Sequence, residues 1–101
     1  MKRNVNYKNE DLVLSVPFVV KKTKSGYVAE CLDLNIVTQG KSLKEAKKNI
    51  TEAINLHMKS ASELGMLDDE LEKLGVVRKN NKLEIPDSEL VRTPIRITMH
   101  S

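Results

Sequence analysis

Aromatic residues are scarce in this 101-residue sequence, which restricts both its core and its ligands. Tyr7, Phe18 and Tyr27 are the three, and tryptophan is absent. Proteins that hold single-stranded nucleic acid usually stack bases on several exposed rings, so this mode of binding is disfavoured. The core must be built from Leu, Ile, Val and Ala instead. A chain of this length predicts one domain with a modest core, to which self-association would be a supplement.

Cysteine and long apolar runs are also lacking. Cys31 is the single cysteine, which excludes an intramolecular disulfide and favours a cytoplasmic location. We expect Cys31 to be buried as a small hydrophobic residue. Together with the distant His57 and His100 it has no zinc-site spacing, so we expect no metal and no cofactor. The longest apolar run, Val16–Val20, is too short to cross a bilayer, and no membrane association is expected. Gly40-Lys41-Ser42 lacks the earlier glycine of a phosphate-binding loop.

The net charge of +3 is unevenly distributed. Residues 1–24 carry six basic and two acidic side chains (+4), residues 25–76 six and nine (−3), and residues 77–101 five and three (+2). An acidic middle suits a basic protein partner, and basic ends suit nucleic acid. Ordinary solvated lysines explain the pattern equally well.

The first half of the chain predicts three strands. Residues 1–11 have no periodicity and are expected to be flexible, whereas residues 12–21 alternate. One face of that strand carries Leu12, Leu14, Val16, Phe18 and Val20. Pro17 cannot donate to a ladder, which predicts an edge position or a bulge. Lys24–Gly26 predicts a hairpin turn in which Gly26 takes a positive φ.

Strands over Tyr27–Leu32 and Ile36–Gln39 follow, separated by a break at Asp33–Asn35, and Gly40 ends the last of them. Short connections between three such strands predict an antiparallel meander.

A long helix is predicted over Leu43–Leu64, with Gly65 as its left-handed stop. Ser42 and Glu45 form a capping box, in which each side chain accepts a hydrogen bond from the other residue's amide. The predicted apolar face consists of Leu43, Ala46, Ile50, Ala53, Ile54, His57, Ala61 and Leu64. This face is expected to pack across the meander.

The remaining segments are shorter. Leu67–Leu74 predicts a second helix ended by Gly75, and Arg78–Lys82 a polar turn. Lys82–Ile85 and Pro94–Met99 predict strands, the last pairing with an open edge in this protomer or in a second one. The expectation is therefore an α+β fold with a core over residues 12–75 and a C-terminal extension over residues 76–101.

Two segments, YVAEC at residues 27–31 and VTQGKSLKEA at residues 37–46, resemble the HicB family of antitoxins. The resemblance spans residues 18–58 and includes Asn49-Ile50 and Glu52-Ala53-Ile54 on the predicted helix. Leu32 stands where the family usually has proline, and Asn35 where a Pro-Gly turn often begins. Both differences fall in the turn between two strands, so they affect loop geometry more than the fold.

The resemblance implies a partial RNase H-like core that binds and neutralises a small, basic HicA-type mRNA-cleaving toxin. It also implies a non-catalytic protein that associates with itself as a homodimer or larger oligomer. Many relatives carry a C-terminal DNA-binding module, either a helix-turn-helix or a ribbon-helix-helix. Residues 66–101 match neither module.

The carboxylates do not favour catalysis. A two-metal nuclease needs several carboxylates that converge on two ions. Glu45 belongs to the capping box and Glu52 lies off the apolar face, which leaves Glu30 and Asp33. We therefore expect no enzyme, and we assign Glu30, Asp33 and Glu52 to partner binding. His57 is predicted to be a core histidine with one hydrogen bond, or else a partner contact.

Two alternatives remain open besides a vestigial nuclease: an orphan HicB-like scaffold, and a transcriptional regulator that binds operator DNA through basic terminal segments. The phosphate contacts of the regulator would come from Lys2, Arg3, Lys21, Lys22, Lys24, Arg92 and Arg96.

Overall fold

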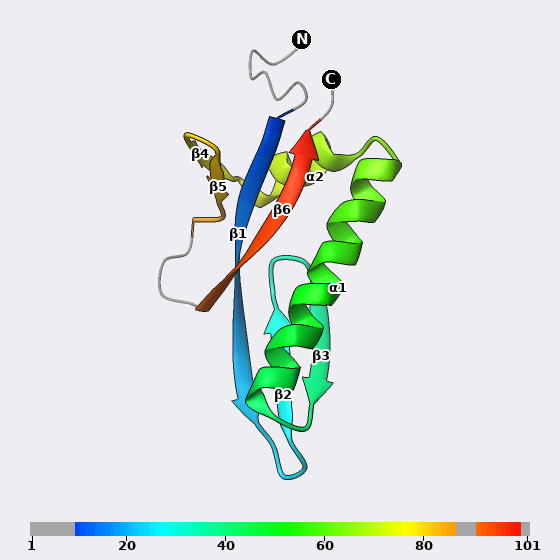
Figure 1. The fold of residues 1–101 in the computed structure, drawn as a ribbon, viewed down its shortest axis with the longest axis vertical. Coiled ribbons are helices and arrows are strands. Elements are labelled where there is room, and N and C mark those ends of the chain that lie inside the picture. The colour runs from blue at the N-terminus through cyan, green and yellow to red at the C-terminus, as the bar shows by residue number, and fades with distance from the viewer. Residues whose placement is uncertain (1–9, 87–90, 100–101) are drawn as a thin grey trace.

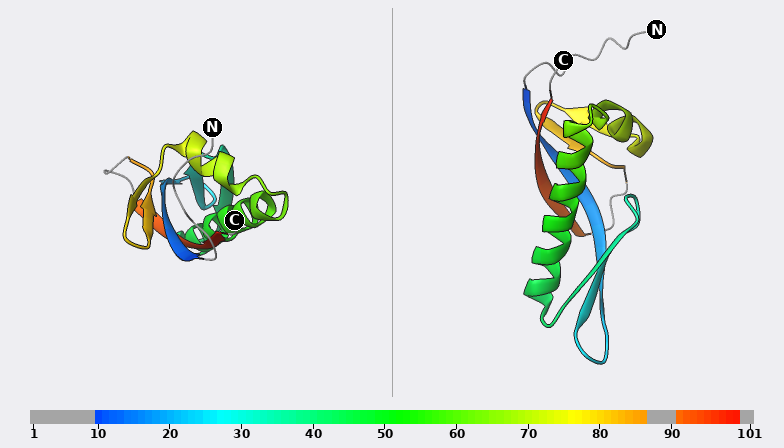
Figure 2. Two further views of the ribbon diagram at one scale, coloured as in Figure 1. Left: turned by 90° about the horizontal axis from the view of Figure 1, so that it is seen from above. Right: turned by 90° about the vertical axis from the view of Figure 1, so that its right-hand side faces the viewer.

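The computed structural model describes residues 10–86 and 91–99 and has an α+β fold, as the sequence predicted. Two helices pack against one six-stranded mixed sheet (Figure 1). The strands are β1 (Glu10–Lys22), β2 (Tyr27–Cys31), β3 (Ile36–Gly40), β4 (Val77–Lys79), β5 (Lys82–Glu84) and β6 (Val91–Met99). The helices are α1 (Leu43–Glu63) and α2 (Leu67–Leu74). Figure 2 shows α1 lying along one side of the twisted sheet.

β1 is the central strand of the sheet and pairs directly with three other strands. It pairs antiparallel with β6 over Glu10–Phe18, parallel with β5 over Val13–Ser15, and antiparallel with β2 over Val19–Lys22. Glu10 and Asp11 therefore belong to a strand and not to a flexible start, while residues 1–9 lie outside the described residues.

Pro17 lies in a gap along one edge of β1. The Val13 amide donates to the Asn81 carbonyl (3.0 Å) and the Thr23 amide to the Gly26 carbonyl (2.7 Å), so odd-numbered residues of β1 point their amides toward β5 and β2. The Pro17 nitrogen faces the same edge, after the β5 pairing ends and before the β2 pairing begins. β1 as a whole is a central strand, but Pro17 itself occupies an edge position on this side, as one of the two predicted alternatives. The missing amide is tolerated because no strand among the described residues pairs with Pro17 on that edge.

Gly26 and Gly40 are needed for close packing. A Cβ atom on Gly26 would lie 2.5 Å from the Gly40 carbonyl oxygen, and one on Gly40 would lie 2.5 Å from the Ala46 nitrogen. The positive φ predicted for Gly26 is wrong, since Gly65 and Gly75 are the described glycines that have one. The β1–β2 turn, the end of β3 and the first turn of α1 thus meet at backbone contact distance.

Both ends of α1 follow local sequence signals. The Glu45 amide donates to Ser42 Oγ (3.1 Å), but the Glu45 carboxylate accepts from the Lys41 amide and not from that of Ser42, which corrects the predicted capping box. At the other end Gly65 has φ 72°. Its amide donates to the Ser62 carbonyl, and the Met66 amide donates to the Ala61 carbonyl. This is a Schellman motif, and it confirms the predicted stop.

The buried face of α1 differs from the predicted one. It consists of Ala46, Ile50, Ile54, Met58 and Ala61. Leu43 and Leu64 are 47% and 72% exposed, so their predicted burial is wrong. Both stand at the ends of the helix, where fewer neighbours cover a side chain. Met58 is buried in the position predicted for His57. The buried face of the helix continues from Ile54 at a spacing of four residues, to Met58, and not at a spacing of three, to His57.

The C-terminal segment shares the core of the first half. Leu83, Ile85, Ile95 and Ile97 are buried in one cluster with the apolar residues of β1 and α1. β6 pairs with β1 of the same chain and begins at Val91, three residues before the predicted start. The predicted polar turn is confined to Asn80 and its neighbour, because β4 and β5 flank it as a short hairpin.

The cap of α1 is testable through Ser42→Ala. Loss of the hydroxyl leaves the Glu45 amide without its acceptor, and we expect the free energy of unfolding to fall by about 1 kcal/mol in urea denaturation. Ser60→Ala, at an exposed position inside the same helix, is the matched control and should leave stability unchanged or slightly raised. Equal losses in the two variants would contradict the capping role.

Candidate partner-binding surfaces

One face of the β1–β2–β3 meander is left uncovered by residues 10–86 and 91–99. Ala29 and Cys31 are buried beneath α1, so alternation turns Val28 and Glu30 to the opposite side. Strand pairing places Val19 and Val37 on either side of Glu30 there. We call this surface the open face, and it comprises Val19, Lys21, Val28, Glu30, Val37 and Gln39. Within residues 10–86 and 91–99, α1 is the helix that packs on β2 and β3, and it lies on the other side.

The open face is more apolar than acidic. Val37 is 62% exposed, and Val19 and Val28 are half-buried. Lys21 Nζ lies 3.4 Å from Glu30 Oε1, which offsets the charge of that carboxylate although the pair itself adds little stability. Asp33 is exposed beside the open face, in the β2–β3 turn, next to the exposed Leu32.

The four acids and bases predicted to bind a partner do not come together. Glu30 and Asp33 lie on the meander, whereas Glu52 is exposed on α1. His57 faces α2, where its Nε2 lies 3.5 Å from Glu70 Oε1 in a contact that becomes an ion pair only when the imidazole is protonated. This nitrogen is buried and makes no hydrogen bond among the described residues. The predicted core histidine with a hydrogen bond is therefore wrong, and His57 lies at the α1–α2 contact.

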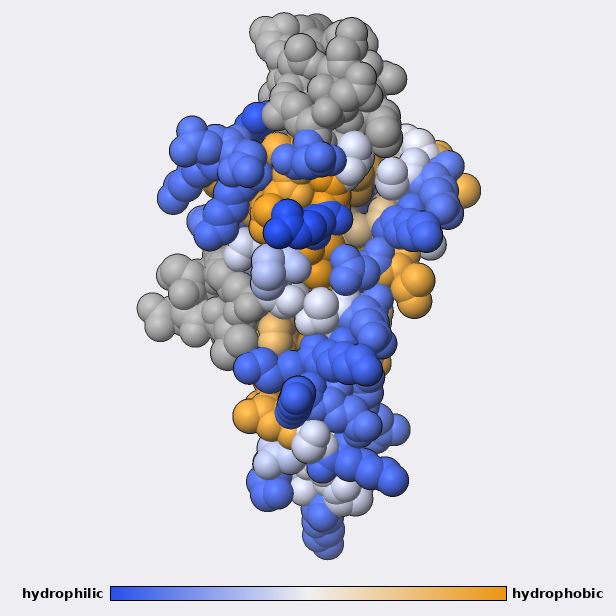
Figure 3. Space-filling model, viewed as in Figure 1, coloured by the Kyte–Doolittle hydropathy of each residue, from blue (hydrophilic) through white to orange (hydrophobic). Residues whose placement is uncertain are grey.

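The lysines gather at one end of the molecule. Residues 21–48 hold seven lysines and three acids (+4), and residues 49–76 hold two lysines and six acids (−4). The contact between Gly26 and Gly40 brings the hairpin turn beside the start of α1. We call this region the lysine end, and it comprises Lys21, Lys22, Lys24, Lys41, Lys44, Lys47 and Lys48. The lower half of Figure 3 is correspondingly hydrophilic.

The residues predicted to bind nucleic acid do not lie together in this arrangement. Lys21, Lys22 and Lys24 belong to the lysine end, and Lys22 Nζ lies 4.9 Å from the centroid of the Tyr27 ring. Arg96 pairs with Val13, eight residues from Lys21 along β1, or about 26 Å at the rise of a strand. Lys2, Arg3 and the Arg92 side chain lie outside the described residues.

Sequence reasoning missed the lysines of α1, because it counted charge by position along the chain. The predicted meander was enough to find them, because the third strand of a meander ends beside the turn that joins the first two strands. The helix that follows Gly40 must therefore begin near Lys24.

No described group of three His, Cys, Asp or Glu side chains converges in a way that could hold a metal ion. Cys31 is buried, and burial is the main reason that the pKa of its thiol is raised. The Asp33 carboxylate adds to this rise in pKa, while main-chain hydrogen bonds at Leu34 and Asp33 oppose it. A thiol with a raised pKa stays protonated and is a poor nucleophile.

Comparisons with protein-family models, curated proteins and solved structures found no match to this chain. Among the helices described, neither has the length and apolar character needed to cross a membrane.

The raised pKa of Cys31 predicts that the free energy of unfolding depends on pH. An unfolded thiol titrates near pH 8.5, so above that pH the unfolded chain holds fewer protons than the native one. The free energy of unfolding should accordingly fall as the pH rises from about 8 to about 10. Urea denaturation at several pH values should show that Cys31→Ala loses part of this decline. An identical decline in both proteins would contradict the assignment.

Proposed function

We propose that this protein is a HicB-like antitoxin, which binds a small HicA-type toxin and blocks its cleavage of mRNA without catalysis of its own. The proposal rests on the resemblance over residues 18–58. A meander with a capped helix on one side is the arrangement that this resemblance leads one to expect.

The observation that carries a binding role is the open face. The described part of the chain covers one side of this three-stranded sheet with α1 and leaves valines exposed on the other side, where a partner can bury them. Val37 and Leu32 are 62% and 71% exposed, and apolar area of this kind is what the centre of a protein interface uses. Asp33, which no described ion pair engages, would contact basic groups at the rim of the interface.

The experiment compares two apolar positions of similar exposure, Val37 and Leu56. Val37→Lys places a charge on the open face, and Leu56→Lys places one on the outer side of α1, where the leucine is 66% exposed. Both positions are exposed, so both variants should keep their stability to within about 0.5 kcal/mol. Val37→Lys should weaken the complex with the protein encoded by the adjacent reading frame by at least about tenfold, whereas Leu56→Lys should not.

The readouts are the dissociation constant and the RNA cleavage by that neighbouring protein, which the wild-type chain should suppress. No complex at micromolar concentration would remove the antitoxin role and leave an orphan scaffold. Equal weakening by the two variants would place the interface elsewhere than on the open face.

A second candidate function is nucleic-acid binding, which the lysine end favours. The seven lysines belong to two adjoining segments, the β1–β2 hairpin and residues 41–48, which lead into α1. Such a cluster would contact phosphates without reading bases, since it lacks arginine and has one nearby aromatic ring in Tyr27.

Salt dependence tests this candidate. Replacing Lys24, Lys44 and Lys48 with alanine should reduce the slope of log affinity against log salt for operator DNA by about 3, because each lysine contributes about one released ion. The matched control replaces Lys59, Lys73 and Lys79, which lie away from the lysine end, and should keep the slope. No binding at low salt would exclude nucleic acid as a main ligand.

A further inference from the structure

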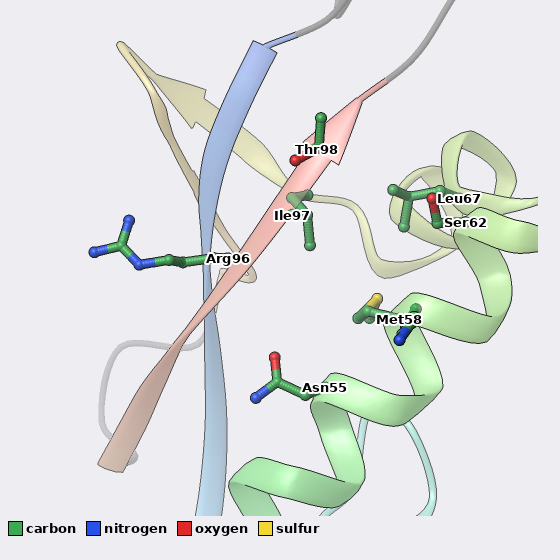
Figure 4. A pocket seen from close by; sticks show the side chains of 8 residues that line it. Asn55, Met58, Ser62, Leu67, Arg96, Ile97 and Thr98 are labelled. Carbon is green, nitrogen blue, oxygen red and sulfur yellow. The ribbon is translucent and has the colours of Figure 1, made fainter.

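A groove separates α1 from β6 at the end of the molecule away from the lysine end (Figure 4). Its volume is about 300 Å³, and its apolar floor is formed by Met58, Leu67 and Ile97. Figure 4 shows Met58 and Leu67 pointing toward β6 across the groove. The open face is formed by other residues, so the groove is a separate surface.

The edge of β6 that borders this groove has unused hydrogen-bonding groups. The main chain of Val13 and Ser15 is directed toward β5, so their partners in β6, Arg96 and Pro94, direct their own main-chain groups away from β1. Three consecutive residues from Arg96 to Thr98 line the groove, which a single face of a strand would not allow. Within the described residues no main-chain hydrogen bond engages the Arg96 or Thr98 amide on that side.

The side chains of these two residues are directed elsewhere. The Thr98 hydroxyl donates to Asp11 Oδ1 (2.8 Å) on β1. The Arg96 side chain extends across β1, away from the groove (Figure 4). Arg96 and Thr98 therefore present mainly their backbone to the groove, as an edge strand does before another strand is added to it.

The usable edge is short. At its start the hydroxyls of Thr51 and Thr93 are 3.0 Å apart, which holds α1 against β6. Pro94 follows and has no amide to donate. Pairing along the whole of β6 is thus impeded, and a segment of a few residues fits better than a second copy of this nine-residue strand.

The charge of the groove indicates the chemistry of its occupant. Lys59, Asn55 and Ser62 line the α1 side, and no carboxylate is among the described lining residues. A strand laid against β6 turns alternate side chains down to the apolar floor and up toward the rim, where Lys59 is exposed.

We propose that this groove binds a short extended segment of a partner protein, which joins the edge of β6 as an added strand. Its apolar side chains cover Met58, Leu67 and Ile97, and its acidic side chains face Lys59. Main-chain hydrogen bonds to Arg96 and Thr98 supply affinity, and the alternation of apolar and acidic residues supplies specificity.

The test uses a fluorescent peptide of alternating valine and glutamate, acetyl-VEVEV-amide, with acetyl-VKVKV-amide as its counterpart. Arg96→Pro removes the amide that points away from β1 and leaves the hydrogen bonds between β6 and β1 intact. It should therefore weaken binding of the acidic peptide about tenfold. Arg96→Ala removes the side chain but keeps the amide, and it should bind as the wild type does. Fluorescence polarisation measures both variants, and circular dichroism verifies their fold.

A second pair of variants tests the charge without touching the sheet. Lys59→Glu should weaken binding of the acidic peptide and favour the basic one, and Lys48→Glu, about 16 Å away along α1, should not. Equal binding of both peptides to the wild-type protein would overturn the proposal, as would an equal effect of the two Arg96 variants or no binding at all. A dimer that Arg96→Pro dissociates, without peptide binding, would assign the edge to a second copy instead.

Discussion

The pairing of β1 on both of its edges is the constraint on which the rest of this structure depends. One edge is taken by β6, and the other is shared by β5 and then β2. The two halves of the chain thereby become one sheet with one core, in which Leu12 and Leu14 contact residues more than eighty positions away. Pro17 marks the point where the shared edge passes from one partner strand to the next.

This arrangement leaves two kinds of unsatisfied surface. α1 covers one side of the meander, so the other side exposes Val37 and its neighbours. β6 uses one edge for β1, so its second edge ends at the groove beside α1. A small sheet with a single long helix cannot cover both. The two proposed protein-binding sites use these two surfaces.

Local chemistry explains which parts of the structure were predictable. The Ser42 cap, the Gly65 stop and the alternation of β1 each involve residues within a few positions of one another, and all three were recognised. Two of the errors arose where a contact joins distant parts of the chain. Gly26 is needed because of Gly40, and His57 is displaced from the core because Met58 fills it and α2 lies beside it.

The sequence by itself determined the elements other than β4, their approximate bounds and the α+β class, because capping, periodicity and turn chemistry are local. The tertiary structure alone decided that the last strand returns to β1 of the same chain, and that the lysines of the hairpin and of α1 form one end. It also separated Glu30 and Asp33 from Glu52 and His57. Strand register and helix orientation arise from burial shared among distant residues, and spacing along the chain does not record them.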